Sequence, residues 1–511
     1  MSIGETARGI WATLLGRPGP AWLRTHTMQV ANARVPRSLD RGHFALIGST
    51  GSGKSTLLEI LIASIFEHLP DEDELDLFNA FLFDPQNDLY RALLAMDLPV
   101  EVVLTNVLDS RGWAWDMCRD VTDPAGAWQF AYSALPEDPR GTDNKFYSDA
   151  PRHVFAAVLR ELVNRGVPWT LRQAYLLAMH ERYAEELCRT STDPGVRRTL
   201  RLFNADQGAT KANIDSSLLT KLANLETYAA LMEHARRRFS LGELVRGEAV
   251  MVAGGDFQFN HVIGPMNYLM LTVLKQKLIG QEKSERRRHY VFIDEFAALN
   301  YNRPAEEVED FFVRGRSRGV RIGIVLHTPE QLVDLYGKPK TNVILGQCQS
   351  KLILKVSDPD GAEYCSRLLG HVHGYEWTSS VSVSVSRGQA SGQSPSTTYG
   401  TSAQETFANY PLVHPDRIMD LPLASLEHGF HGFAIVPGAT GTHKWRFHLT
   451  PEWLAEHVVP TADHVRSYES CRRPGHQQRL MDLTRTEVER LGLTFDPKSQ
   501  RFLSPEQLEA V

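Results

Sequence analysis

The chain has 511 residues, of which 42% are hydrophobic and 23% charged, so its composition is that of a globular protein with two or three domains. Its 55 basic and 61 acidic residues give a net charge of -6, which excludes the broadly cationic character of a protein that coats nucleic acid. We find no secretory signal and no apolar stretch suited to a bilayer, and the five cysteines are scattered. We therefore expect a protein of the reducing cytoplasm.

Strands and helices alternate after a mixed N-terminal segment, residues 1–40. The sequence HFALIG at 43–48 predicts a short buried strand that runs into a glycine-rich turn, and the apolar spacing at 57–66 predicts a helix. AFLF at 80–83 and VEVVL at 100–104 predict two more strands. This strand, helix, strand order implies that the strands pair in parallel.

Residues 116–244 interrupt that alternation with long helical periodicities, which predict an inserted all-helical domain. Strands are predicted again at 248–253, 289–293, 321–326 and 351–356, and helices at 265–280 and from residue 305 onward. We therefore predict an α/β fold in which residues 41–115 and 245–450 form a mostly parallel sheet flanked by helices.

The regular pattern weakens after residue 370. SSVSVSVS at 379–386 has a period of two, which indicates either an exposed hairpin strand or a flexible tongue, and residues 387–402 are loop-like. Residues 451–511 are charged and helical in character, so we expect a C-terminal helical tail.

The sequence GSTGSGKS at 48–55 has the phosphate-loop pattern, in which the backbone N–H groups of a glycine-rich turn surround nucleotide phosphates. It follows a predicted strand and precedes a predicted helix, as this mechanism requires, so we predict a P-loop NTPase with a RecA-like core. Lys54 would place its charge on the terminal phosphates of ATP, and Ser55 would offer its hydroxyl to Mg²⁺. The predicted nucleotide-binding residues are Gly48, Ser49, Thr50, Gly51, Ser52, Gly53, Lys54, Ser55 and Thr56.

YVFIDEF at 290–296 ends a predicted buried strand in two adjacent carboxylates. Because parallel strands bring their carboxyl ends to one edge of a sheet, Asp294 would hold Mg²⁺ and Glu295 would polarise the attacking water. A strand followed by a helix-capping acidic pair gives the same pattern, but the phosphate loop upstream favours the catalytic interpretation.

Several further candidates are single polar residues. His327 ends the strand at 321–326, where it could sense the γ-phosphate or belong to a helix-capping turn. Asp84 ends the strand at 80–83 and could orient substrate or cap a helix. Arg111 and Lys355 are candidate fingers that would supply charge to the nucleotide of a neighbouring subunit. Three arginines, which would face either a subunit interface or a surface turn, follow the acidic strand: Arg314, Arg316 and Arg318.

These segments, in this order, resemble the conjugative coupling proteins of type IV secretion, within the wider family of hexameric DNA-pumping ATPases. The resemblance spans about residues 30–370 and includes segments outside the general ATPase motifs: LFDPQNDLY, LTNVLDSRGWAW, KFYSDAPR, RGRSRGVRIGIVLHTPEQL and KVSDPDGAEYCSRLLG. The chain departs from the family pattern at Gln86, Val107 and His327, where many relatives have lysine, proline and glutamine.

The resemblance implies a homo-hexameric ring that uses ATP and Mg²⁺ to move DNA through its central channel, with a relaxase or relaxosome and the secretion channel as partners. It implies roles in hydrolysis for Asp294 and Glu295, in nucleotide sensing for His327, and at subunit contacts for Arg111 and Lys355. Most relatives begin with a membrane anchor, whereas this sequence shows no integral membrane segment, so we expect either that it docks on a complex at the inner membrane or that the transport role belongs to a different machine. Two alternatives stay open: a nucleotide-gated receptor for a relaxase or secreted protein, and a chromosome-processing or defence DNA translocase.

Overall fold

The structure is a computed structural model that describes residues 27–36, 40, 42–67, 78–135, 145–203, 209–284, 286–299, 305–386, 396–425, 427–438, 441–458, 465–496 and 501–503. Within these residues, one sheet contains nine strands: β3 (Phe44–Ile47), β4 (Phe78–Asp84), β5 (Glu101–Leu104), β8 (Ala249–Gly254), β9 (Arg288–Ile293), β10 (Val320–Leu326), β11 (Ser350–Ile353), β14 (Phe430–Pro437) and β15 (Thr442–Leu449). Their order across the sheet is β15-β14-β11-β3-β10-β9-β4-β8-β5.

The sheet is parallel from β11 to β5, and the β14–β15 hairpin adds two antiparallel strands at the β11 edge. Every residue of β3, β4, β9 and β10 is buried, as expected for parallel strands that are covered on both faces. The predicted α/β fold with a mostly parallel sheet is therefore confirmed, and each strand predicted between residues 43 and 356 is present with shifts of a few residues at its ends.

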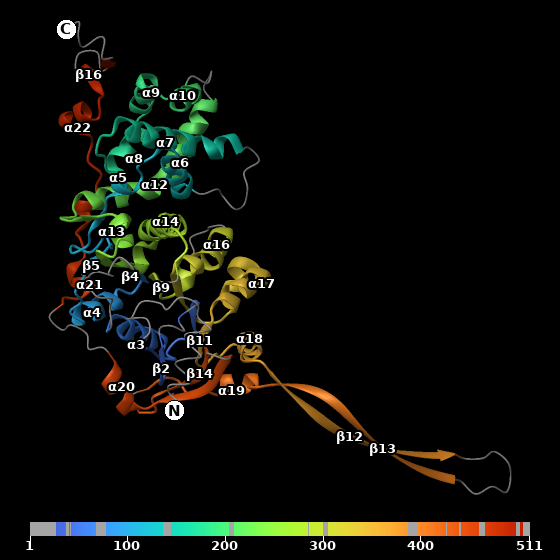
Figure 1. The fold of residues 1–511 in the computed structure, drawn as a ribbon. Coiled ribbons are helices and arrows are strands. Elements are labelled where there is room, and N and C mark those ends of the chain that lie inside the picture. The colour runs from blue at the N-terminus through green and yellow to red at the C-terminus, as the bar shows by residue number, and fades with distance from the viewer. Residues whose placement is uncertain are drawn as a thin grey trace.

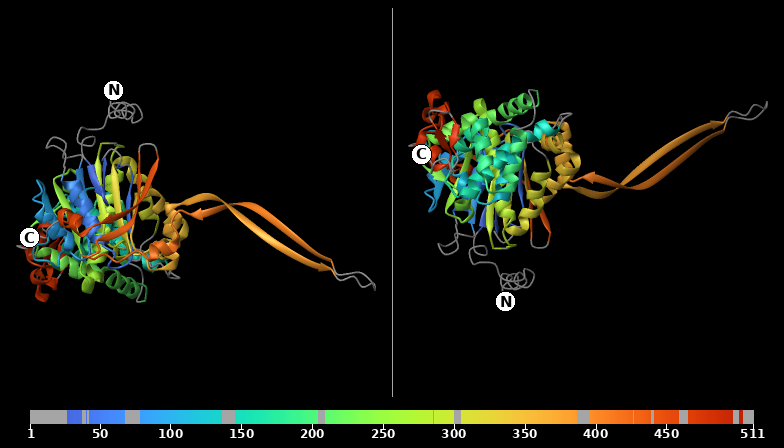
Figure 2. Two further views of the ribbon diagram at one scale, coloured as in Figure 1. Left: turned by 90° about the horizontal axis from the view of Figure 1, so that it is seen from below. Right: turned by 90° about the horizontal axis from the view of Figure 1, so that it is seen from above.

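Helices cover both faces of this sheet (Figure 2). One face packs against α3 (Lys54–Phe66), α4 (Asp88–Ala95) and the small hairpin of β1 (Thr27–Val30) and β2 (Ala33–Pro36). The other packs against α14 (Asn260–Ile279), α16 (Ala305–Gly315) and α17 (Glu330–Gln347). Because side chains alternate along a strand, Leu46 joins the first core and Ile47 the second, so a single short strand connects two hydrophobic layers.

A helical domain is inserted between β5 and β8 and forms the upper part of the molecule in Figure 1. Its helices are α5 (Met117–Asp120), α6 (Pro124–Ala134), α7 (Lys145–Arg165), α8 (Leu171–Met179), α9 (Glu181–Thr190), α10 (Pro194–Arg198), α11 (Leu200–Phe203) and α12 (Ala209–Glu233). The entry strand β6 (Ala114–Trp115) pairs with the exit strand β7 (Arg238–Phe239), which is followed by α13 (Leu241–Val245). This pairing brings the two ends of the insertion together, and the helical insertion predicted from the sequence is present.

A long two-stranded ribbon, β12 (His371–Ser386) and β13 (Ser396–Pro411), projects away from the sheet and helices between α18 (Pro359–Leu369) and α19 (Pro415–Met419) (Figures 1 and 2). The hairpin-strand alternative predicted at 379–386 is confirmed, although the strand already begins at His371. The loop predicted at 387–402 is wrong for residues 396–402, which belong to β13, and residues 387–395 lie outside the described residues. A composition rich in Ser, Thr and Gly is typical of loops, but here a partner strand pairs with it.

After α20 (Pro451–His457), the C-terminal segment passes beside β5 and the helical domain (Figure 1). We call residues 465–493 the C-terminal strap. Short helices α21 (Tyr468–Cys471), η5 (Gly475–Gln478) and α22 (Arg485–Arg490) alternate in it with extended stretches, and a hairpin of β16 (Thr494–Asp496) and β17 (Arg501–Leu503) follows. Three further short helices lie next to strands of the sheet: η3 (Phe257–Phe259) after β8, α15 (Phe296–Leu299) after β9 and η4 (Arg316–Arg318) before β10.

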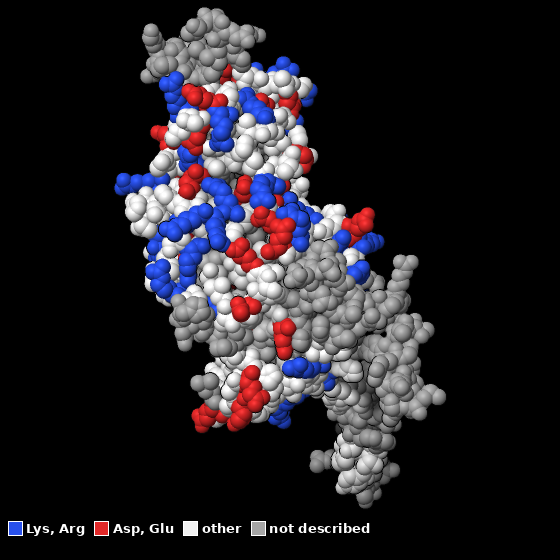
Figure 3. Space-filling view, turned by 60° about the vertical axis from the view of Figure 1, so that its left-hand side comes forward, with Lys and Arg blue, Asp and Glu red and all other residues white. Residues whose placement is uncertain are grey.

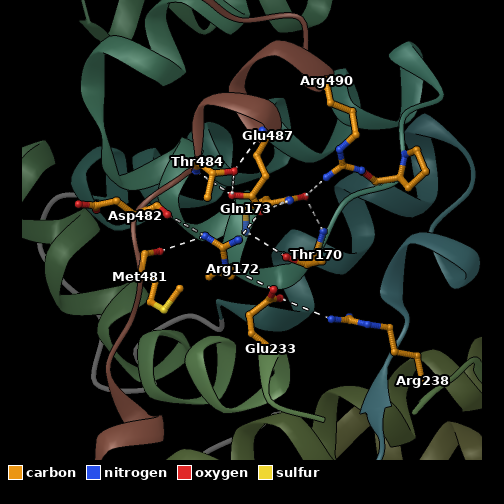
Figure 4. A network of polar contacts seen from close by, with 11 residues as sticks. Thr170, Arg172, Gln173, Glu233, Arg238, Met481, Asp482, Thr484, Glu487 and Arg490 are labelled. Atoms are coloured by element: carbon orange, nitrogen blue, oxygen red, sulfur yellow. Dashed lines mark hydrogen bonds and ion pairs between the residues drawn. The ribbon is translucent and has the colours of Figure 1, made fainter. Parts of the chain in front are cut away.

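The strap is tied to both parts of the molecule by arginines. The buried Arg473 donates to the carbonyls of Val107 and His234, at 2.9 Å each, and so links the segment after β5 to the end of α12. On α8, Arg172 donates to the carbonyls of Met481 and Asp482 and pairs with Glu487 of α22 (Figure 4). Among the described helices, none is both long enough and apolar enough to cross a membrane.

Candidate nucleotide-binding site

The phosphate loop joins β3 to α3 and is held by the two strands that flank β3. The N–H of Gly48 donates to the carbonyl of Leu326 at the end of β10 (3.1 Å), and that of Ser49 donates to the carbonyl of Lys355 beyond β11 (2.7 Å). Gly51 and Gly53 have φ of 76° and 91°, a region that disfavours other residues. A Cβ on Gly53 would also lie 2.8 Å from the ring of Phe430 on β14. The loop therefore needs its glycines for both conformation and space.

Lys54 is buried at the start of α3 and points back across the loop. Its Nζ donates to the carbonyl of Ser49 at 3.0 Å and to Nδ1 of His327 at 3.2 Å. Burial lowers the pKa of Lys54 to about 8, while the charges of Asp294 and Glu295 oppose that shift. The lysine is thus a positive charge inside the site, facing the acidic pair, and its hydrogen bonds are of the kind that phosphate oxygens could replace.

Asp294 and Glu295 follow directly after β9, which is separated from β3 by β10 alone. Asp294 is buried, and the hydroxyl of Ser55 lies close enough to stabilise its charged form. Burial and the neighbouring charge of Glu295 raise the pKa of Asp294 to about 6, against the opposing effects of Lys54 and Ser55. Glu295 has a φ of 64°, an uncommon conformation for a residue other than glycine. The loop and the acidic pair therefore meet at one edge of the sheet.

His327 follows β10, between the loop and the acidic pair. Because an ammonium group can only donate, Nδ1 of His327 accepts the hydrogen bond from Lys54, and the proton of the neutral ring lies on Nε2. Burial and the Lys54 charge lower the pKa of His327, and Glu295 raises it. The side chain of Gln331 accepts the backbone N–H of His327 at 2.9 Å, which fixes the turn that presents the ring.

Asp84 ends β4, the strand next to β9, and is fully buried. One of its oxygens accepts the N–H of Leu89 at 2.8 Å, so the carboxylate caps the first turn of α4. Burial, Asp294 and Asp88 raise the pKa of Asp84 to about 7. The sequence did not single out Glu59 of α3, whose pKa is also raised to about 7 by burial, Asp88 and Asp294. The sequence could have indicated Glu59 as a candidate, because it is the lone ionisable residue in the apolar segment LLEILIASIF.

Arg111 does not reach the site within this chain, and the side chain of Lys355 is bound elsewhere. Arg111 binds both oxygens of Asp109, at 2.9 and 2.6 Å, and donates to the carbonyl of Arg466 on the strap. It lies beyond β5, five strand positions from β3, which is about 24 Å at the usual strand spacing. Lys355 donates from Nζ to the carbonyls of Met419 and Leu421, at 2.7 and 3.0 Å.

The arginines after the acidic strand lie at the end of the sheet opposite the loop, because they precede β10 whereas His327 follows it. Arg314 pairs with Asp310 on α16, and Arg318 donates to the carbonyl of Gln281. They belong to a surface turn in this chain. Figure 3 shows the left side of Figure 1 turned forward, where basic and acidic side chains are intermixed. Ion pairs at β5 and α13 fit this pattern: Arg237–Glu101, Arg119–Glu243 and Arg246–Glu248.

Comparison with known proteins identifies the family. The family described as the type IV secretion-system coupling protein DNA-binding domain matches residues 27–446. A comparison with curated protein sequences finds no match. Among solved structures, the plasmid coupling protein TrwB in complex with ADP and Mg²⁺ has a TM-score of 0.60 at 18% identity, over 90% of this chain and 94% of that chain.

Two further TrwB structures are similar to the same extent. The complex with a non-hydrolysable ATP analogue has a TM-score of 0.58 at 17% identity, over 90% of this chain and 94% of that one. The unbound form has a TM-score of 0.58 at 18% identity, over 85% and 90%. These likenesses show a shared fold, and the family match extends over most of the chain. The chain belongs to the family of type IV secretion-system coupling proteins, through the DNA-binding domain that defines it.

Proposed function

We propose that the chain is an ATP-driven DNA translocase that works as a homo-hexameric ring and delivers DNA to a type IV secretion channel. The observation that carries this proposal is the meeting of the phosphate loop with Asp294 and Glu295 at one sheet edge, bridged by Lys54 and His327. A family defined by a DNA-binding domain supports DNA as the cargo.

The loop fits the phosphates of ATP. Gly51 and Gly53 turn the backbone as a phosphate loop requires, and the hydroxyl of Ser52, although buried, has no hydrogen-bond partner among the described residues. Lys54 and the start of α3 add positive charge at the same place. The complexes of TrwB with ADP and with an ATP analogue support the choice of nucleotide. Residues 48–56 would therefore hold ATP.

Ser55 and Asp294 fit Mg²⁺. Their side chains already interact, and in the described part of the chain no cluster of three or more His, Cys, Asp or Glu could hold a metal by itself. Mg²⁺ in nucleotide sites takes one or two protein ligands and completes its shell with phosphate oxygens and water, so this pair suffices. When bound, the ion supplies charge compensation to the phosphates.

Glu295 is the group best placed to orient and polarise the attacking water, because it stands directly beside Asp294, the metal-binding candidate. Its left-handed backbone turns the chain sharply directly after β9. His327 contacts Lys54, so a change in what Lys54 binds changes the hydrogen bond of the imidazole. This contact supports a role for His327 in reporting the nucleotide state to α17.

Arg111 is too far from the loop of its own chain to touch the same nucleotide, so any nucleotide that it contacts belongs to a neighbouring copy. Lys355 adjoins the loop of its own chain through its backbone, but its side chain is bound by carbonyls at the end of α19. Ring assembly would supply such a neighbour, and both residues are proposed as fingers there.

The test is an ATPase assay with and without DNA. Lys54→Ala and Glu295→Gln are expected to abolish DNA-stimulated hydrolysis, with Glu295→Gln still binding nucleotide. The exposed Lys338→Ala and Glu456→Gln serve as charge-matched controls and should hydrolyse ATP at the wild-type rate. Hydrolysis that ignores both single- and double-stranded DNA would refute the translocase. Full DNA transfer in cells by Glu295→Gln would favour the nucleotide-gated receptor.

A further inference from the structure

The β12–β13 ribbon has two chemically different faces. Residues that lie directly opposite one another in an antiparallel pair share a face, and so do residues two apart along a strand. Val383 is opposite Tyr399, and Val381 is two residues away, so these three side chains lie on one face. Ser380, Ser382 and Ser402 lie on the other, where the hydroxyls of Ser380 and Ser402 bond to each other at 2.8 Å.

The first face, which we call the apolar face and define by Val381, Val383 and Tyr399, is exposed to an unusual degree. Their exposed fractions are 68%, 55% and 73%, so these side chains are mostly in contact with solvent. An isolated two-stranded ribbon is at best marginally stable in water, because one pair of strands buries too little apolar area. A ribbon of this length therefore needs a surface that covers its apolar face.

Nucleic acid and lipid do not fit this face. The strand sequences at 371–386 and 396–411 contain no Lys or Arg to attract phosphates or anionic head groups. In the described residues each ribbon strand pairs with the other alone, so the outer edges carry unpaired backbone groups that hydrocarbon would not tolerate. Between Thr378 and Ser386, and between Ser396 and Gln404, the sequence also lacks the charged residues and prolines that usually protect such edges from other protein chains. The occupant is therefore protein.

The size of the face favours a second copy of this chain over a foreign protein. Strands of 16 residues are about 54 Å long, and a two-stranded ribbon is about 10 Å wide, so a contact along the whole ribbon would bury at most about 500 Å² on each side. The total of about 1,000 Å² is at the lower limit for a stable interface between separate proteins. Such a contact is effective where something else already holds the partners together, as ring assembly would.

We propose that the ribbon is an intersubunit arm whose apolar face lies on a neighbouring copy of the chain. This inference rests on the ring assembly in the proposed function. It assigns the ribbon to assembly rather than to nucleotide chemistry, so losing the arm weakens association between copies while the fold of each copy is kept.

Two matched triple variants of the full chain test the arm. Val381→Glu, Val383→Glu and Tyr399→Glu together place three charges on the apolar face, and Ser380→Glu, Ser382→Glu and Ser402→Glu place three on the opposite face of the same ribbon. A third variant shortens the ribbon by joining Thr378 to Gln404, which are opposite in register, through an Asn-Gly turn. Sedimentation over a range of concentrations, with DNA and a non-hydrolysable ATP analogue, measures assembly, and ATPase is measured in the same samples.

We expect the apolar-face and shortened variants to need at least a tenfold higher concentration for half-assembly, and the opposite-face variant to stay within twofold of wild type. Equal assembly by all four proteins overturns the arm. Flotation with phosphatidylcholine or phosphatidylglycerol vesicles tests lipid as the occupant. If the wild-type chain floats with the vesicles and the apolar-face variant does not, lipid covers the face and the arm is again overturned. A wild-type chain that stays monomeric overturns it as well, and DNA-stimulated ATPase in that sample shows whether the translocase falls with it.

Discussion

Glu295 adopts a backbone conformation that costs stability, and its replacement by glycine should reveal that cost. A φ of 64° places Glu295 in the left-handed region, which costs a residue with a Cβ about 1 to 2 kcal/mol. Glycine has no such cost, but its freedom in the unfolded chain takes back about 0.4 to 1 kcal/mol. We therefore expect Glu295→Gly to be more stable than Glu295→Ala by about 1 kcal/mol, because the two variants differ only in the Cβ.

Calorimetry without nucleotide is the suitable assay, since a bound ligand would add its own stabilisation. A difference of about 1 kcal/mol corresponds to about 2 °C in the unfolding midpoint of a domain of this size. Both variants, and Glu295→Gln, lack the carboxylate and should lose ATP turnover. Equal midpoints for the glycine and alanine variants would show that the conformation carries no strain. Turnover that persists in Glu295→Gly would remove this residue from catalysis.

Three other predictions concern stability and fit. Burial lowers the pKa of His43 to about 3 from 6.5, so the unfolded chain binds more protons than the folded chain between these pH values. The free energy of unfolding should therefore fall as the pH decreases from 7, and His43 alone should account for about 2 kcal/mol of that loss at pH 5. Urea unfolding at pH 7 and at pH 5 measures the difference. A double-mutant cycle on Arg172→Met and Glu487→Gln should give a coupling energy of about 1 to 2 kcal/mol in urea unfolding, because this ion pair is largely buried. A coupling energy near zero would show that the pair does not fasten the C-terminal strap to α8. Gly53→Ala forces a Cβ against Phe430 at a φ of 91°, so nucleotide affinity measured by calorimetric titration should fall at least tenfold, and unchanged affinity would contradict the packing argument.

Local patterns made the central sheet predictable. The strand before the loop and the strand that ends at Asp294 are continuous apolar runs, and such runs are typical of parallel strands buried on both faces. The rule that parallel strands share a carboxyl edge then predicts that Lys54 and Asp294 meet, as the structure shows. The roles assigned to these residues in hydrolysis stay predictions.

Tertiary contacts decided the parts that the sequence did not indicate. No strand was predicted at 430–449, because FHGFAIVP mixes polar and apolar residues; β14 forms because pairing with β11 buries Phe433 and Ile435. The strand β13 has a loop-like composition, and its register with β12 overrides that preference. The distance of Arg111 from the loop follows from strand order, which spacing along the chain does not specify. Burial raises the pKa of Glu59, and Asp88 and Asp294, which are remote in sequence, raise it further.

Removing the C-terminal strap would affect both domains of the protein. Arg473 donates hydrogen bonds to the carbonyls of Val107 and His234. Arg172 of the helical domain donates to the carbonyls of residues 481 and 482 and pairs with the carboxylate of residue 487. A chain ending near residue 460 would leave those groups unsatisfied on both sides of the junction between its domains. A force applied at the far end of the chain would load the helical domain first, through Arg165 and Leu491, and the junction at Arg473 only afterwards.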